Sequence, residues 1–229
     1  MIGIFDSGEG GENASLHLRA MSPEADITLF LDRESSPFGT KSEAEITAIT
    51  DRGIERLAKV GCDVVLIACC TAGTVHSGLC PENRRISFPI IAPTAKEALR
   101  ASSGKIAVLA TDATVRSHAF ARCIGRGRTT EIEASPLVGY IEGGERDGHI
   151  SASLGEYLDG LAQKIEGTGA DTLVLGCTHF ERLSAEILSR ISALTDRKIS
   201  LINSALIGAS AILARYPRAA AGRGRTVRI

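Results

Sequence analysis

The sequence predicts an α/β protein of two similar, pseudo-symmetric lobes. Each lobe would hold a mostly parallel sheet flanked by helices, with the active site in the cleft between them. Short apolar segments alternate with helical patterns, and several of these segments are apolar throughout, as strands buried on both faces are. A sequence pattern also repeats at a fixed distance. The length of 229 residues allows one large or two small domains, at roughly 150 residues each.

Eight apolar segments are the candidate strands. They lie at residues 2–5, 27–31, 64–68, 88–92, 106–110, 131–134, 173–175 and 199–202. The fourth segment is interrupted by proline, which favours an edge strand or a crossover between lobes because proline cannot donate to a sheet ladder.

Three apolar stripes between these segments have helical spacing. They consist of Ile46, Ile49, Ile54, Leu57 and Val60, then Leu154, Leu158, Leu161 and Ile165, and then Leu183, Ile187, Leu188 and Ile191. Ser42, followed three residues later by Glu45, predicts a capping box at the start of the first of these helices. A last helix, at residues 205–214, is expected to return to the first lobe.

An internal repeat supports the two-lobe arrangement. Residues 63–73 and 171–181 share the order Asp, apolar strand, small residue, Cys, Thr. Their cysteines, Cys69 and Cys177, are 108 residues apart. We therefore place the first lobe at residues 1–93 plus 204–229 and the second lobe at residues 94–203.

The composition argues against several classes of partner. The 26 Lys and Arg against 27 Asp and Glu give a formal net charge of −1, so no global field recruits nucleic acid or anionic lipid. No apolar run approaches the ~18 residues that cross a bilayer, and the first residues lack the basic region of a signal peptide. We expect a cytoplasmic protein that binds a small molecule and no nucleic acid or membrane, with a homodimer as an open alternative to a monomer.

The six cysteines show no disulfide spacing, so we expect free thiols. Cys62, Cys80 and Cys123 are expected to be small buried apolar residues. Cys69 and Cys177 each follow a strand, where a helix N-terminus can lower a thiol pKa from about 8.5 towards neutrality. Two such thiols facing each other could take a proton from one face of a carbon acid and return one to the other face. This chemistry inverts a stereocentre and needs no cofactor.

Other chemistries fit the sequence less well. A zinc site is not expected because CxxC and HExxH are both absent. A cysteine hydrolase would leave the second thiol idle, and an oxidoreductase usually carries CxxC. Gly8, Gly10 and Gly11 follow the first strand, but the last glycine of a dinucleotide fingerprint would fall at Asn13. Residues 39–42 lack the spacing of a phosphate-binding P-loop.

Six segments together carry a family pattern. In chain order they are IGIFDSGEGG, SPFGTKS, IACCTAGT, LATDATVRSHAF, SPLVGYIEGG and LGCTHF. They resemble, almost end to end, the glutamate racemases of the cofactor-independent aspartate/glutamate racemase superfamily. The Thr-His pair after the second cysteine favours the glutamate branch, because the aspartate branch typically has Thr-Glu there. The resemblance implies conversion of L-glutamate to D-glutamate for peptidoglycan, without a cofactor or metal.

The resemblance also implies roles for individual residues. Cys69 and Cys177 would be the two acid/bases, acting on the D and the L enantiomer respectively, and Asp6 and His179 would assist them in that order. Glu142 would support the site from nearby. The residues expected to line the site and hold the substrate are Ser7, Pro37, Phe38, Gly39, Cys70, Thr71, Thr114 and Thr178. Polar residues at strand ends can also be simple helix caps.

The chain departs from the family pattern in three places. Cys70 stands where the family has asparagine, Phe38 replaces a tyrosine, and residues 12–18 replace an apolar stretch. The alternative function is therefore that of a diverged relative, which acts on another carbon acid such as aspartate or a hydantoin, or only binds a small acid. The basic residues of segment 214–229 are expected in a solvated tail or an edge strand, with no assigned function.

Overall fold

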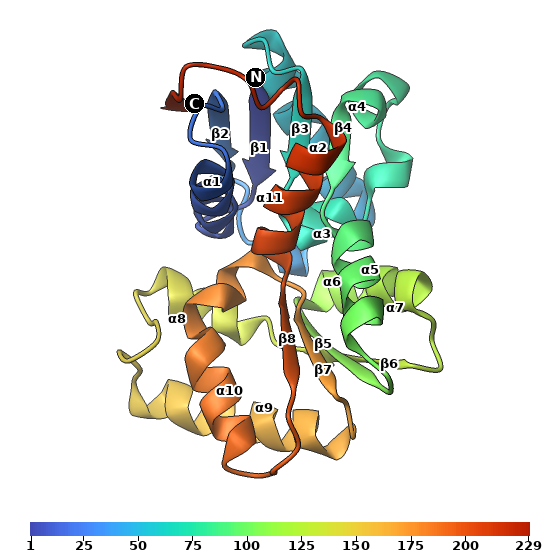
Figure 1. The fold of residues 1–229 in the computed structure, drawn as a ribbon, viewed down its shortest axis with the longest axis vertical. Helices are drawn as coiled ribbons and strands as arrows, with labels where there is room; N and C mark the ends of the chain where they lie inside the picture. The colour runs from blue at the N-terminus through green and yellow to red at the C-terminus, as the bar shows by residue number, and fades with distance from the viewer.

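The computed structural model describes residues 1–229 and contains two all-parallel sheets, one above the other along the long axis (Figure 1). The first sheet has the strand order β4-β3-β1-β2-β9, and the second has the order β6-β5-β7-β8. The strands are β1 (Ile2–Asp6), β2 (Ile27–Leu31), β3 (Val64–Ile67), β4 (Ser87–Pro89), β5 (Ile106–Ala110), β6 (Thr129–Glu133), β7 (Thr172–Leu175), β8 (Ser200–Asn203) and β9 (Thr226–Arg228).

The two sheets repeat one topology. The order β2-β1-β3-β4 in the first sheet matches β6-β5-β7-β8 in the second, so β3 corresponds to β7. The register also matches, because Ile2 pairs with Val64 in the first sheet as Ile106 pairs with Thr172 in the second. The predicted internal repeat is thus confirmed. The predicted lobe limits stay a prediction, although every strand of the second sheet lies between residues 106 and 203.

Helices cover both faces of each sheet. The α-helices are α1 (Gly10–Met21), α2 (Glu43–Lys59), α3 (Cys70–Gly73), α4 (Pro81–Ile86), α5 (Ile91–Ala101), α6 (Asp112–Ser117), α7 (Ala119–Ile124), α8 (Pro136–Glu142), α9 (Ala152–Gly167), α10 (Ser184–Ser192) and α11 (Ser204–Arg215). Three short 3₁₀ helices are η1 (Phe38–Thr40), η2 (His76–Gly78) and η3 (Thr178–Leu183). The predicted capping box is present, since the Ser42 N–H donates to Glu45 Oε2 at 2.9 Å and Ser42 Oγ accepts from the Glu45 N–H at 3.3 Å.

The first sheet is packed by alternation of side chains. Ile4 of β1 points to the layer that contains α1 and α11, whereas Phe5 points to the layer that contains α2. Helix α11 returns from the second sheet and packs against α1, as the sequence predicts. Figure 1 shows α11 running up from β8 in front of the first sheet.

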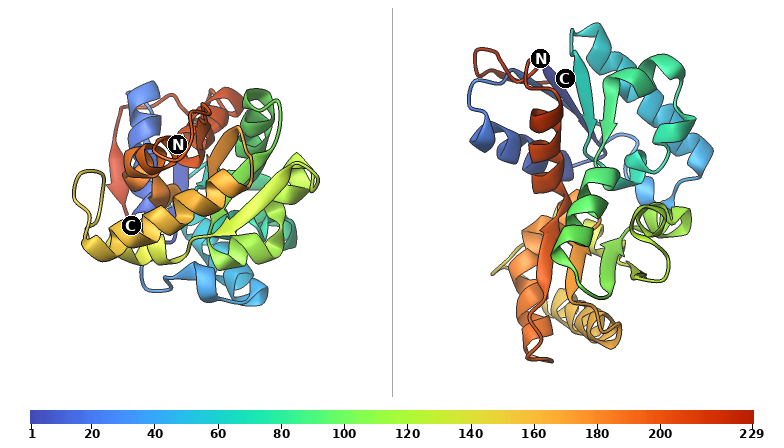
Figure 2. Two further views of the ribbon diagram at one scale, coloured as in Figure 1. Left: turned by 90° about the horizontal axis from the view of Figure 1, so that it is seen from below. Right: turned by 45° about the vertical axis from the view of Figure 1, so that its right-hand side comes forward.

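The second sheet is packed in the same way. Leu173 and Leu175 of β7 face the layer formed by α9 and α10, and Val174 faces the layer formed by α5 and α7. Figure 2 shows these helices on opposite sides of the lower sheet. Residues just after β1, β3, β5 and β7 line one cavity between the two halves, and they are Ser7, Cys69, Thr111 and Cys177.

Two sequence predictions are wrong. The expected strand at residues 88–92 ends at Pro89, and α5 begins at Ile91. Pro93 is compatible with the helix because it lies in the first turn, where backbone N–H groups have no partner in the helix. Cys123, expected to be buried, is exposed on the short helix α7, and Cys80 is only partly buried. The edge position of β4 is confirmed, and all six thiols are free.

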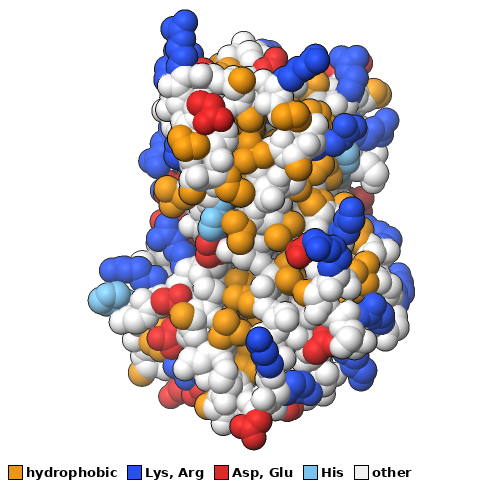
Figure 3. All heavy atoms as spheres, viewed as in Figure 1, with side chains coloured by type: hydrophobic (Ala, Val, Ile, Leu, Met, Phe, Trp, Pro, Cys, Tyr) orange, Lys and Arg blue, Asp and Glu red, His pale blue; other side chains and the backbone are white.

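The surface carries charges of both signs. Acidic and basic side chains are interspersed over the face in Figure 3, in keeping with the net charge of −1. None of the helices combines the length and the apolar character needed to span a bilayer. The predicted homodimer stays a prediction, because the structure contains a single chain.

Two glycine-to-alanine substitutions are expected to change stability in opposite directions. A Cβ at Gly53 of α2 would lie 2.2 Å from Phe5 Cε2, so Gly53→Ala should lower the free energy of unfolding by about 1–3 kcal/mol through overpacking. A Cβ at Gly160 of α9 meets no atom within 4 Å, so Gly160→Ala should raise it by about 0.5–1 kcal/mol through helix propensity. Urea unfolding of both variants measures this, and shifts of the same sign would contradict the packing described for α2.

Candidate active site

A cavity of about 710 Å³ opens between the two halves, at the carboxyl ends of the parallel strands. Nine residues predicted from the sequence line it: Ser7, Pro37, Phe38, Gly39, Cys69, Thr71, Glu142, Cys177 and His179. Residues from both sheets thus meet at one cavity, which is where parallel α/β folds place their ligands.

Cys69 occupies the turn between β3 and α3. Its side chain is 6% exposed, and its Sγ lies 3.5 Å from Ser7 Oγ, which follows β1. Because β1 and β3 are neighbouring strands, their ends bring Ser7 and Cys69 together. The first thiol is therefore almost wholly buried, with a hydroxyl as its hydrogen-bonding neighbour.

Cys177 occupies the equivalent turn between β7 and η3. Its side chain is 8% exposed, and its Sγ lies 3.6 Å from Nδ1 of His179. The opposite ring nitrogen, Nε2, lies 3.2 Å from Glu142 Oε1, and the hydrogen bond from His179 lowers the pKa of Glu142. An ionised Glu142 accepts the Nε2–H, which leaves Nδ1 of a neutral imidazole to accept the thiol proton. Thiol, imidazole and carboxylate thus form a connected chain.

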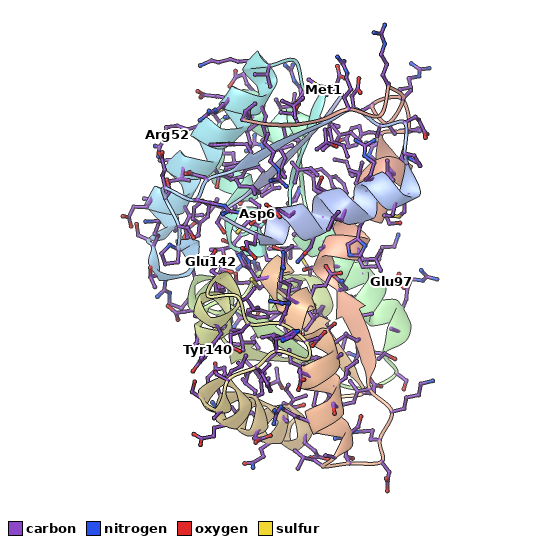
Figure 4. All side chains as sticks on the ribbon, turned by 90° about the vertical axis from the view of Figure 1, so that its left-hand side faces the viewer. Met1, Asp6, Arg52, Glu97, Tyr140 and Glu142 are labelled. Atoms are coloured by element: carbon purple, nitrogen blue, oxygen red, sulfur yellow. The ribbon has the colours of Figure 1, made fainter.

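Asp6 lies at the end of β1, fully buried below the cavity. Its Oδ1 accepts from the Gly8 N–H at 3.0 Å, and its Oδ2 accepts from Thr178 Oγ1 at 3.1 Å. Burial raises the pKa of Asp6, although His179 opposes the shift. Figure 4 shows Asp6 and Glu142 at the level where the upper and lower halves meet. Asp6 therefore links the two halves, because it lies in the first half and its partner Thr178 directly follows Cys177 in the second half.

Three threonine hydroxyls form a cluster on one wall. Thr71 Oγ1 lies 2.8 Å from Thr111 Oγ1 and 3.2 Å from Thr114 Oγ1. The Oγ1 atoms of Thr111 and Thr114 lie 3.0 Å from each other. Thr71 and Thr111 line the cavity, whereas Thr114 is buried behind them. The wall presents hydroxyl groups that can donate to a carboxylate.

Four predicted residues do not line the cavity: Asp6, Cys70, Thr114 and Thr178. Cys70 is buried in the apolar cluster that includes Ile91 and Ala95 of α5, with its Sγ 3.7 Å from Ser204 Oγ. A contact between Cys70 and a substrate thus stays a prediction, as do the roles of the other three residues.

The expected lowering of the thiol pKa is wrong. Burial and the neighbouring charge of Asp6 raise the pKa of Cys69 to about 11, and burial raises that of Cys177 as well. The helices that follow are too short for a strong dipole, since α3 has four residues and η3 is a 3₁₀ turn. No Lys or Arg lines the cavity. These surroundings therefore favour neutral thiols.

The model of the Asp/Glu/hydantoin racemase family matches residues 16–212. The chain belongs to this family. A glutamate racemase from Cupriavidus pinatubonensis is 38% identical over 196 residues, which cover 81% of this chain and 69% of that protein. A glutamate racemase from Deinococcus radiodurans is 32% identical over 237 residues, covering 99% and 77% respectively. The chain is accordingly a racemase, which is an isomerase.

A solved structure shares the racemase fold. The glutamate racemase from Bacillus anthracis, at 22% identity, superposes with a TM-score of 0.88 over 100% of this chain and 86% of that chain. The two-lobe α/β fold is thereby confirmed. No group of three or more His, Cys, Asp or Glu side chains is placed to hold a metal ion, and independence from cofactors stays a prediction.

Sequence reasoning missed part of the racemase cavity. The additional lining residues are Ser36, Thr40, Thr111, Asp112, Glu133, Ser135, Pro136, Val138 and Gly139. Thr111 and Asp112 belong to the polar cluster directly after β5, and its position at a strand end, like that of Ser7 after β1, is the signal for both. The others depend on how the β6–α8 and β2–α2 connections fold over the cavity, which no local pattern predicts.

The buried thiol makes stability sensitive to alkaline pH. The folded pKa of Cys69, about 11, lies above the usual value of 9.0, so the unfolded chain loses this proton first. Stability from the neutral thiol is present below pH 9 and is lost as the pH rises towards 11. Between pH 8 and 10.5 the free energy of unfolding of wild type should fall by roughly 2 kcal/mol more than that of Cys69→Ser. Urea unfolding at both pH values tests this, and parallel losses would refute it.

Proposed function

We propose that this racemase interconverts L- and D-glutamate with two cysteine acid/bases. The observation that carries the proposal is the pair of buried thiols, one from each half, that line the same cavity at equivalent strand ends. The named relatives, at 32% and 38% identity, support glutamate as the substrate. The product, D-glutamate, would serve peptidoglycan synthesis.

In the direction from D- to L-glutamate, the Cys69 thiolate removes the proton from the α carbon. The electron pair of the broken C–H bond is delocalised onto the α-carboxylate, where hydroxyl and amide donors stabilise the developing charge. The Cys177 thiol then gives its proton to the opposite face and becomes the thiolate. The reverse reaction uses the two sulfurs in the opposite order, so no net proton is consumed.

Substrate binding would supply the charge that activates the thiols. The cavity lining lacks Lys and Arg, and burial raises the pKa of both thiols, which favours their neutral form. The α-ammonium of an amino acid brings a positive charge beside them, which favours the thiolate. His179, backed by Glu142, can accept the proton of Cys177, and the buried Asp6 can assist Cys69. The hydroxyls of Thr71, Thr111 and Ser135 are available to the two carboxylates.

Hydrogen exchange in D₂O tests the proposal. Each enantiomer of glutamate should gain deuterium at the α carbon and convert to the other enantiomer, as followed by NMR and by circular dichroism. Aspartate and a hydantoin are the comparison substrates, because Phe38 and Cys70 depart from the family pattern. Exchange with either of them and none with glutamate would show a diverged specificity. Binding without exchange would show a non-catalytic protein.

A further inference from the structure

Helix α1 places a polar stripe against the η3 turn of the second half. Glu9, directly before the helix, pairs with Arg182 at 3.5 Å. One turn on, Asn13 Nδ2 donates to the Thr178 carbonyl oxygen at 2.9 Å. One further turn on, His17 Nε2 lies 2.6 Å from Glu181 Oε1.

Asn13 makes the buried contact of this stripe. It is 8% exposed, whereas the pair of His17 and Glu181 is about a quarter exposed. Its partner Thr178 lies between Cys177 and His179 and is also held through its side chain by Asp6. The first half of the molecule therefore fixes both the main chain and the side chain of the residue between the second thiol and its imidazole.

We propose that Asn13 is a positioning residue for the Cys177–His179 pair, in a racemase of the proposed function. Its amide fixes the peptide plane that joins Thr178 to His179. The direction of that plane sets where the imidazole leaves the chain, and so sets the 3.6 Å approach of Nδ1 to the Cys177 sulfur. A shift of about 1 Å at such a contact can cost a factor of about 100 in rate.

Two substitutions at Asn13 test the proposal, with one control on the same helix. Asn13→Asp keeps the shape but loses the N–H donor, and Asn13→Ala removes the contact without adding charge. Glu12→Gln is the control, because Glu12 pairs with Arg33 at 3.3 Å and Arg228 at 3.6 Å, away from η3. We expect kcat/KM for glutamate to fall about 10- to 100-fold in both Asn13 variants and to stay within twofold in the control.

Isotope effects show which proton transfer is impaired. When proton transfer at Cys177 becomes rate-limiting, the primary deuterium kinetic isotope effect on kcat/KM should rise for L-glutamate that carries deuterium at the α carbon. It should fall for deuterated D-glutamate, whose deuterium is removed by Cys69, towards the equilibrium isotope effect for transfer from carbon to sulfur. A loss of activity with unchanged isotope effects for both enantiomers would overturn the proposal, because a general loss of structure does not distinguish the two faces.

Alkylation by iodoacetamide, followed by peptide mass spectrometry, gives a readout that needs no substrate. The ratio of the Cys177 rate to the Cys69 rate should change at least threefold in both Asn13 variants and stay unchanged in Glu12→Gln. If wild type fails to racemise glutamate while this ratio responds, the proposed function fails and the positioning role stands. An unchanged ratio overturns the positioning role. If Asn13→Asp does not fold, Asn13→Ala decides, and far-ultraviolet circular dichroism monitors both.

Discussion

Cys69→Ser and Cys177→Ser will each reduce racemisation of glutamate by at least about a thousandfold. A positioned acid/base is worth roughly 10²–10⁴ in rate, and a serine hydroxyl is far less acidic than a thiol, so it replaces neither function. Racemisation needs both transfers, and one missing sulfur stops the reaction in both directions. The measurement is the initial rate of change in circular dichroism from each enantiomer, with Cys123→Ser, on the exposed face of α7, as the control.

The single variants should differ when only one transfer is needed. A glutamate analogue with chlorine at Cβ loses chloride after its α proton is removed, so no reprotonation is required. Cys69→Ser retains Cys177 and should act on the L analogue, whereas Cys177→Ser should act on the D analogue. Equal residual elimination from both analogues by both variants would contradict the assignment of one face to each sulfur.

Gly10→Ala will lower kcat by about a hundredfold or more and will also destabilise the protein. A Cβ at Gly10 would lie 2.0 Å from Thr178 Oγ1 and 2.9 Å from His179 Nδ1, so α1 and η3 could not keep their present distance. Displacement of the imidazole breaks the contact with Cys177, and small displacements at a reacting group cost about 100-fold in rate. Steady-state kinetics and thermal unfolding of the variant give both effects.

Gly127→Ala is the control for this substitution, because a Cβ there meets no atom within 4 Å and its activity should equal that of wild type. Wild-type kinetics in Gly10→Ala would mean that α1 and η3 can move apart without loss of racemase activity. The close approach at Gly10 would then have no part in catalysis.

Much of the fold could be predicted because it is encoded locally. Continuous apolar runs mark β1, β3, β5 and β7 as buried parallel strands, and the repeat around Cys69 and Cys177 predicts their equivalent positions. The capping box at Ser42 places the start of α2 correctly. These patterns survive folding because burial of strands and capping of helices depend on near neighbours in the chain.

The rest depends on contacts between distant segments. The surroundings of Cys70 include Ser204, 134 residues away, so a local motif could not show that this residue is buried outside the cavity lining. The pKa of Cys69 depends on burial beside Asp6, which outweighs the short helix that follows. Asn13 reads as an ordinary helix residue until η3 is placed against it.

Strand β9 has a consequence for solubility. It covers the apolar edge strand β2, and its ladder is flanked by hydrogen bonds from the Ile27 N–H to the Arg225 carbonyl and from the Ile229 N–H to the Leu29 carbonyl. The equivalent edge strand, β6, has no such cover, but it carries the exposed carboxylate of Glu133. Charged edges resist pairing with other chains, whereas an uncovered ITLFL segment invites it. Removal of residues 224–229 should therefore cause aggregation, detectable by light scattering, even where the cavity itself is left intact.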